Sequence, residues 1–100
     1  MKKILLCCAA GMSTSLLVNK MKTEAEKRGL EVQIWAEPLD KAKEEFTKAD
    51  VVLLGPQVKY ALPEAKKIAE ENNISIDVIN MVDYGMMNGA KVLDQALKLL

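Results

Sequence analysis

Apolar and polar positions alternate along the chain in a way that predicts four β-strands, with a helical segment after each. Residues 3–8 and 50–54 are almost continuously apolar, which is typical of strands buried on both faces. Residues 31–36 and 74–78 alternate apolar and polar side chains, as half-exposed strands do. The chain therefore reads as two inner strands and two edge strands.

The segments between these strands carry helical periodicity. Residues 14–28 place apolar side chains on one face, and Gly29 follows where a helix commonly ends. A weaker helix is expected to open at Pro38. A third helix runs to residue 71, with Pro63 tolerable only in a first turn, and Asn88 can cap the last.

Strands that alternate with helices predict an α/β fold: a parallel sheet with helices on both faces. Right-handed crossovers and the strand types together give the order 2-1-3-4, in one domain over residues 1–100. The winding direction reverses between the first and third strands, and ligands bind at the carboxyl ends of strands at such a point. The loops there are residues 8–15 and 55–60.

Composition narrows the function. Fourteen basic residues balance 14 acidic ones, which argues against a nucleic-acid-binding or membrane-surface domain. There is no histidine, so no histidine-based mechanism or metal site is expected within the chain. The apolar run near the start has only seven residues, which is short for the apolar region of a secretory signal peptide. No segment approaches the ~20 apolar residues that a bilayer span needs, so we expect a cytoplasmic protein.

The first switch-point loop holds the candidate chemistry. Cys8 ends the first strand, and Ala9-Ala10-Gly11-Met12-Ser13-Thr14-Ser15 leads into the helix. Small residues let successive backbone N–H groups surround an anion, and the helix N-terminus adds partial positive charge. A thiol in such a place ionises readily, and a thiolate is a nucleophile able to accept a phosphoryl group.

Plainer interpretations stand beside this one. A cysteine at a strand end is often a small buried apolar residue, and a Ser-Thr-Ser run often only caps a helix. Cys7 lies one residue deeper and is expected to pack in the layer between sheet and helices. Adjacent cysteines close no stabilising loop, and without histidine they make no zinc site.

Three segments in order carry a family resemblance. The run from Cys8 to Ser15 resembles the phosphorylation loop of enzyme IIB of the bacterial sugar phosphotransferase system, in its lactose/cellobiose/chitobiose family. Residues 49–57 resemble the family's third strand and following loop, and Asp83-Tyr84-Gly85 stands where the family carries Tyr-Gly. The family's four-stranded parallel sheet agrees with the order predicted above.

The resemblance implies that Cys8 accepts a phosphoryl group from a phosphohistidine of enzyme IIA and passes it to a sugar bound by the membrane enzyme IIC. The sugar would be a β-linked disaccharide such as cellobiose, chitobiose or lactose. Residues 9–15 would hold the phosphate, without a cofactor or metal, in a monomer that docks transiently at the inner face of the membrane. Expected rim or partner contacts are Met12, Gly55, Pro56, Gln57, Tyr84 and Met86.

Two other functions remain open at this point. Low-molecular-weight cysteine phosphatases resemble this arrangement, but the sixth residue after their cysteine is arginine, and here it is Thr14. Asp83 could stand for their general acid, although a turn residue is the plainer reading. A non-catalytic domain that binds an anion would not need Cys8 at all.

Overall fold

The computed structural model describes residues 1–9 and 12–100 and contains a four-stranded parallel sheet in the order β2-β1-β3-β4. The predicted α/β fold and strand order are therefore confirmed. The strands are β1 (Lys2–Cys8), β2 (Val32–Pro38), β3 (Val51–Leu54) and β4 (Ser75–Val78).

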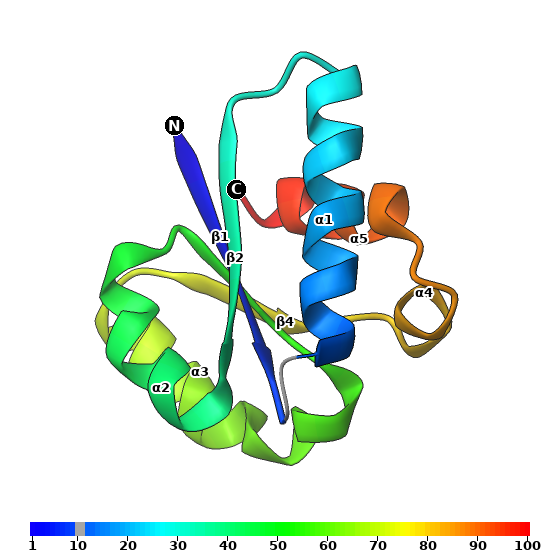
Figure 1. Cartoon of the computed structure of the whole chain (residues 1–100). Helices are drawn as coiled ribbons and strands as arrows, with labels where there is room; N and C mark the ends of the chain where they lie inside the picture. The colour runs from blue at the N-terminus through cyan, green and yellow to red at the C-terminus, as the bar shows by residue number, and fades with distance from the viewer. Residues whose placement is uncertain (10–11) are drawn as a thin grey trace.

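Helices cover both faces of this sheet (Figure 1). The α-helices are α1 (Met12–Lys27), α2 (Leu39–Glu45), α3 (Leu62–Glu71), α4 (Met81–Gly85) and α5 (Gly89–Leu99), and the short 3₁₀ turns are η1 (Phe46–Lys48) and η2 (Pro56–Ala61). Helices α1 and α5 pack on one face, and α2 and α3 pack on the other. Helix α1, which follows β1, and helix α3, which follows β3, therefore lie on opposite faces of the sheet at the switch point between these two strands.

Strand β1 supplies side chains to both layers. Ile4 and Leu6 point to the α1/α5 core, while Leu5 and Cys7 point to the α2/α3 core, and all four are fully buried. Successive side chains on a strand alternate between faces, so an apolar run without polar interruptions is what this central position requires. The same holds for β3, where every residue is buried.

The edge strand β2 is half-exposed, as its alternation predicts. Ile34 is buried under α1, and Val32 and Ala36 pack on the same core, whereas Trp35 packs on the opposite one. In the register of the sheet, Cys8 lies beside Pro38, the last residue of β2.

The helix ends follow the expected chemistry. Gly29 has a φ of 69°, and Leu30 N–H donates to the Ala25 carbonyl at 2.9 Å, which closes α1. Pro63 lies in the first turn of α3. The Asn88 side chain accepts a hydrogen bond from Lys91 N–H at 3.1 Å and so caps α5.

Two elements differ from the sequence expectation. Pro38 ends β2, and α2 begins only at Leu39, because Pro38 itself has extended backbone angles. Helix α4 was not expected: Asn80 begins it by accepting hydrogen bonds from the backbone N–H groups of Val82 and Asp83.

Helices α1 and α5 approach each other closely. A Cβ on Gly89 would lie 2.7 Å from the backbone carbon of Lys20, so only glycine fits without moving the helices apart. At the other end of α1, Arg28 bonds Glu24 at 2.8 Å and Asp94 of α5 at 2.5 Å. The hydrogen bond from Arg28 lowers the pKa of Asp94.

Candidate functional site

Cys8 is the last residue of β1 and lies at the carboxyl edge of the sheet. Its side chain is 2% exposed, and Sγ lies 3.8 Å from the Glu37 carbonyl oxygen. Because Cys8 stands two residues beyond Leu6, strand alternation directs it to the α1/α5 face. The candidate nucleophile therefore ends a strand that is paired on both sides, beneath the beginning of α1.

Cys7 is a different kind of cysteine. Its side chain is fully buried in the α2/α3 core, which confirms the prediction that it packs there. Burial, and secondarily the neighbouring Cys8, raises the pKa of Cys7 to about 12. Cys7 therefore stays a neutral thiol at physiological pH, and only the thiolate form of a cysteine is nucleophilic.

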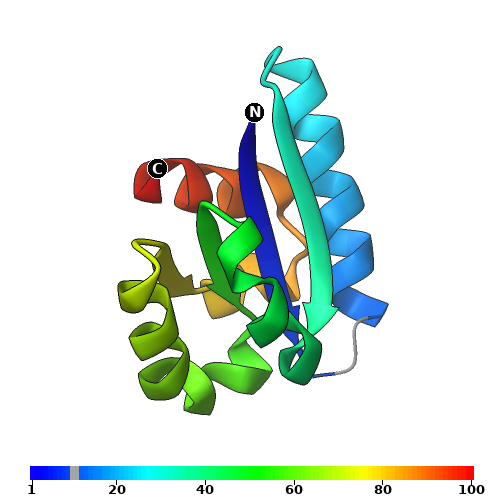
Figure 2. The same cartoon turned by 90° about the vertical axis from the view of Figure 1, so that its left-hand side faces the viewer.

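The end of β1 and the start of α1 lie at one edge of the molecule, the edge that η2 also occupies (Figure 1). In Figure 2 the two chain termini lie at the opposite edge. Ala9 is exposed. Ala10 and Gly11 lie outside the described residues, and so do the side chains of Met12 and Ser13.

Helix α1 has 16 residues, and a helix of this length carries partial positive charge at its N-terminus. Ser15 is exposed on the first turn, whereas Thr14 is fully buried. The two hydroxyl residues therefore face different surroundings, a distinction that the sequence does not reveal.

Thr14 belongs to a hydrogen-bonded group of three side chains. Its Oγ1 lies 3.2 Å from the Tyr84 hydroxyl oxygen, and Gln57 Nε2 donates to the same oxygen at 3.1 Å. Tyr84 is only 8% exposed and packs in the α1/α5 core. These contacts join α1, η2 and α4, so the structure brings together three predicted site residues that are far apart in sequence.

The second loop begins directly beside the end of β1. Gly55 N–H donates to the Cys7 carbonyl at 2.7 Å, which extends the pairing of β1 and β3 by one residue. Gly55 is buried, Pro56 is half-buried and Gln57 is exposed. A Cβ on Gly55 would lie 2.8 Å from Gln57 Oε1 and 3.3 Å from the Cys7 carbonyl oxygen, so this approach suits glycine.

Among the expected rim residues, Met86 is 73% exposed and Tyr84 is buried. Met87 is half-buried, packs on the α1/α5 core and has a φ of 52°. Met81 and Val82 are also exposed, at 65% and 66%, and sequence reasoning missed them because it did not expect α4. The available signal was that two apolar residues, Met81 and Val82, stand next to each other shortly after the last strand.

Residues 3–95 match the family model described as "PTS system, Lactose/Cellobiose specific IIB subunit". The chain belongs to this family. Three curated relatives are similar to it. The oligo-β-mannoside-specific EIIB component of Bacillus subtilis is 54% identical over the whole of this chain and 97% of its own length. The galactose-specific and cellobiose-specific EIIB components of two Lactococcus lactis strains are each 48% identical over 99% of this chain and 96% of their own.

Two solved structures are also similar to this chain. The cellobiose-specific IIB component of Borrelia burgdorferi has a TM-score of 0.81 at 39% identity, covering 98% of this chain and 90% of its own. The lactose-specific IIB domain of Streptococcus pneumoniae shares the fold, with a TM-score of 0.88 at 23% identity over 98% of this chain and 96% of its own.

This IIB component is thus a phosphoryl carrier in sugar uptake, a phosphotransferase that works with IIA and IIC components. Within residues 1–9 and 12–100, no helix is long and apolar enough to cross a bilayer.

The charge around the site of this IIB component is unlike that of a cysteine phosphatase. The chain has one arginine, Arg28, and it lies just beyond the far end of α1, bonded to Glu24 and Asp94. A phosphatase needs the bidentate guanidinium next to its cysteine. Asp83, the candidate general acid, instead lies half-buried in α4 with its N–H bonded to Asn80.

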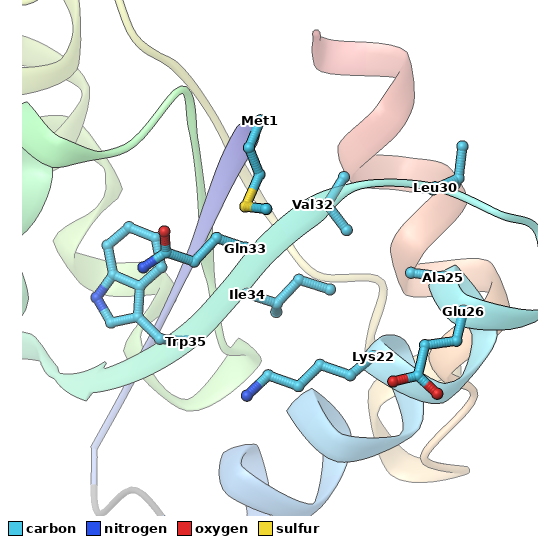
Figure 3. A pocket seen from close by; sticks show the side chains of 9 residues that line it. All are labelled: Met1, Lys22, Ala25, Glu26, Leu30, Val32, Gln33, Ile34 and Trp35. Atoms are coloured by element: carbon cyan, nitrogen blue, oxygen red, sulfur yellow. The ribbon is translucent and has the colours of Figure 1, made fainter.

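A groove of about 500 Å³ lies elsewhere on this IIB component, between α1 and β2 (Figure 3). Its lining includes Met1, Lys22, Val32 and Trp35. Among the described residues, neither Cys8 nor any expected phosphate-binding residue lines it, so this groove does not mark the proposed reaction site.

Proposed function

We propose that Cys8 carries the phosphoryl group, which it receives from a phosphohistidine of IIA and delivers to a sugar bound by IIC. The Cys8 thiolate attacks phosphorus, the N–P bond breaks, and the imidazole nitrogen keeps the bonding electron pair. A sugar hydroxyl oxygen then attacks phosphorus, the S–P bond breaks, and the thiolate leaves. The hydroxyl proton passes to a base on the acceptor side.

The observation that carries this proposal is the contrast between the two adjacent thiols. Cys7 is buried in the α2/α3 core, and burial raises its pKa to about 12. Cys8 ends β1 at the switch-point edge, where α1 begins. Backbone N–H groups of residues 9–15, with the Ser13, Thr14 and Ser15 hydroxyls, would hold the equatorial oxygens.

The sugar is proposed to be β-linked, a disaccharide such as cellobiose, chitobiose or lactose. Two of the relatives support this class, since their names specify oligo-β-mannosides and cellobiose. The galactose-specific relative, at comparable identity, shows that the family model alone does not fix the sugar. Transfer assays with IIC-containing vesicles and these sugars in parallel would rank them.

Docking is proposed to use the exposed apolar side chains of α4 and of the residue that follows it, namely Met81, Val82 and Met86, with Leu16 of α1. The expected rim residues Met12, Pro56 and Gln57 would extend this surface. Methionine side chains adapt to differently shaped partners, and a carrier must dock two. We propose that residues 1–100 act as one monomeric carrier domain on the cytoplasmic side, without nucleic acid.

The test is intact-mass measurement after incubation with phosphoenolpyruvate, enzyme I, the histidine carrier protein and IIA. The expected gain is one phosphoryl group, ~80 Da, absent in Cys8→Ser and retained in the matched control Cys7→Ala. Retention of the full gain in Cys8→Ser would refute the proposal. Turnover of p-nitrophenyl phosphate through Cys8 would favour the phosphatase, and phosphate binding without either reaction would favour the passive domain.

A further inference from the structure

Three side chains next to the carboxyl edge form a hydrogen-bonded chain. Gln57 Nε2 can only donate, so the Tyr84 oxygen accepts its hydrogen bond at 3.1 Å. The Tyr84 hydrogen is then available for Thr14 Oγ1, 3.2 Å away. Either hydroxyl can donate in this bond, and when Tyr84 donates, the Thr14 hydroxyl hydrogen is left for a further acceptor.

The surroundings of Thr14 and Tyr84 make these hydrogen bonds hard to replace. Thr14 is fully buried and Tyr84 is 8% exposed, so water does not freely replace either partner. Buried hydrogen bonds are stronger than exposed ones, and a buried hydroxyl without a partner is costly. Thr14 lies in the first turn of α1, and Cys8 directs its side chain to the same face of the sheet.

We propose that Tyr84 is a positioning residue for phosphoryl transfer: it holds the Thr14 side chain so that the Thr14 hydroxyl donates to the phosphoryl group on Cys8. This rests on the proposed role of Cys8. Tyr84 touches neither phosphorus nor sulfur in this proposal, and its burial sets it below the docking surface. Its effect therefore falls on the rate of transfer and not on the affinity for IIA.

The test compares Tyr84→Phe with Tyr60→Phe. Both substitutions remove one phenolic hydroxyl, but Tyr60 is 74% exposed and lies outside the hydrogen-bonded chain. We expect Tyr84→Phe to lower kcat for transfer from phospho-IIA roughly 10-fold with KM unchanged, less than the ~10²–10³-fold loss of a donor that touches the transition state. Tyr60→Phe should match the wild type.

Thr14 variants then test the route of the effect. Thr14→Val should lower kcat about 10²-fold, and Thr14→Ser should restore most of it. Adding Tyr84→Phe to Thr14→Val should cause no further loss, because both act through one hydroxyl. The ³¹P resonance of the phosphocysteine should shift in Tyr84→Phe but not in Tyr60→Phe.

The outcomes separate the two proposals. A wild-type chain that gains no phosphoryl group at Cys8 overturns the proposed function. Normal phosphorylation at Cys8 with a wild-type kcat in folded Tyr84→Phe overturns only the positioning role, as does an additive double variant. If Tyr84→Phe fails to fold, Thr14→Val serves instead, since it removes the hydroxyl that Tyr84 is proposed to hold; unchanged kcat there would also overturn the positioning role.

Discussion

Replacing Cys7 with alanine removes a thiol that the folded protein holds protonated far into the alkaline range. The pKa of this thiol rises from an ordinary 9.0 to about 12 on folding, mainly because burial disfavours the thiolate. The folded state therefore binds this proton more tightly than the unfolded state. Its contribution to stability is complete below pH 9 and is lost progressively as the pH rises toward 12.

The size of the effect follows from these two values. Relative to neutral pH, ionisation of Cys7 in the unfolded chain alone should reduce the free energy of unfolding by ~1 kcal/mol at pH 10 and ~3 kcal/mol at pH 11. For a domain whose whole stability is about 5–15 kcal/mol, this loss is large enough to measure.

We would measure this loss of stability by urea unfolding of the wild type and Cys7→Ala at pH 7 and pH 10, with a non-thiol reductant present. Lysines and tyrosines titrate in both proteins, so only the difference between them reports Cys7. The stability advantage of the wild type should shrink by ~1 kcal/mol between the two pH values. Cys7→Val, with a different packing cost, should show the same pH dependence. An unchanged difference would show that the folded state does not hold this proton.

Three further substitutions test other contacts. Gly89→Ala places a Cβ 2.7 Å from the backbone of Lys20 and should destabilise the protein by ~1–3 kcal/mol in urea unfolding; unchanged stability would contradict the close packing of α1 and α5. Asn80→Ala removes the cap of α4 and should cost ~1 kcal/mol, whereas Asn80→Asp should retain most of it. Gly55→Ala puts a Cβ 2.8 Å from Gln57 Oε1 and should displace that flexible side chain. The rate of phosphoryl transfer should then fall by a larger factor than the melting temperature suggests. A lower melting temperature with an unchanged transfer rate would show that the position of Gln57 does not matter for transfer.

The central part of the fold was predictable because its signals are local. Residues 51–54 are apolar without interruption, and only an inner strand has use for that pattern. The alternation around Ile34 likewise marks an edge strand. Helix α4 was not predictable, because five residues are too few to show a period, and a side-chain cap at Asn80 begins the helix.

The candidate site likewise has parts that the sequence predicts and parts that it does not. The place of Cys8 and the burial of Cys7 follow from strand alternation and topology, both readable in the sequence. The burial of Tyr84 does not, because it depends on Thr14 and Gln57, 70 and 27 residues away along the chain. The roles of residues 9–15 as phosphate ligands stay predictions.

The double pairing of β1 also bears on when the carrier becomes competent. Cys8 precedes both strands that flank its own: β1 pairs with Val32–Pro38 and with Val51–Leu54. A growing chain therefore makes Cys8, the proposed nucleophile, early, but can complete the pairing of its strand only after residue 54 has been made and docked. Long-range parallel pairing forms slowly, and we expect the amide hydrogens of β1 to be among the most protected from exchange. We therefore expect a partly folded chain to be a poor phosphoryl acceptor.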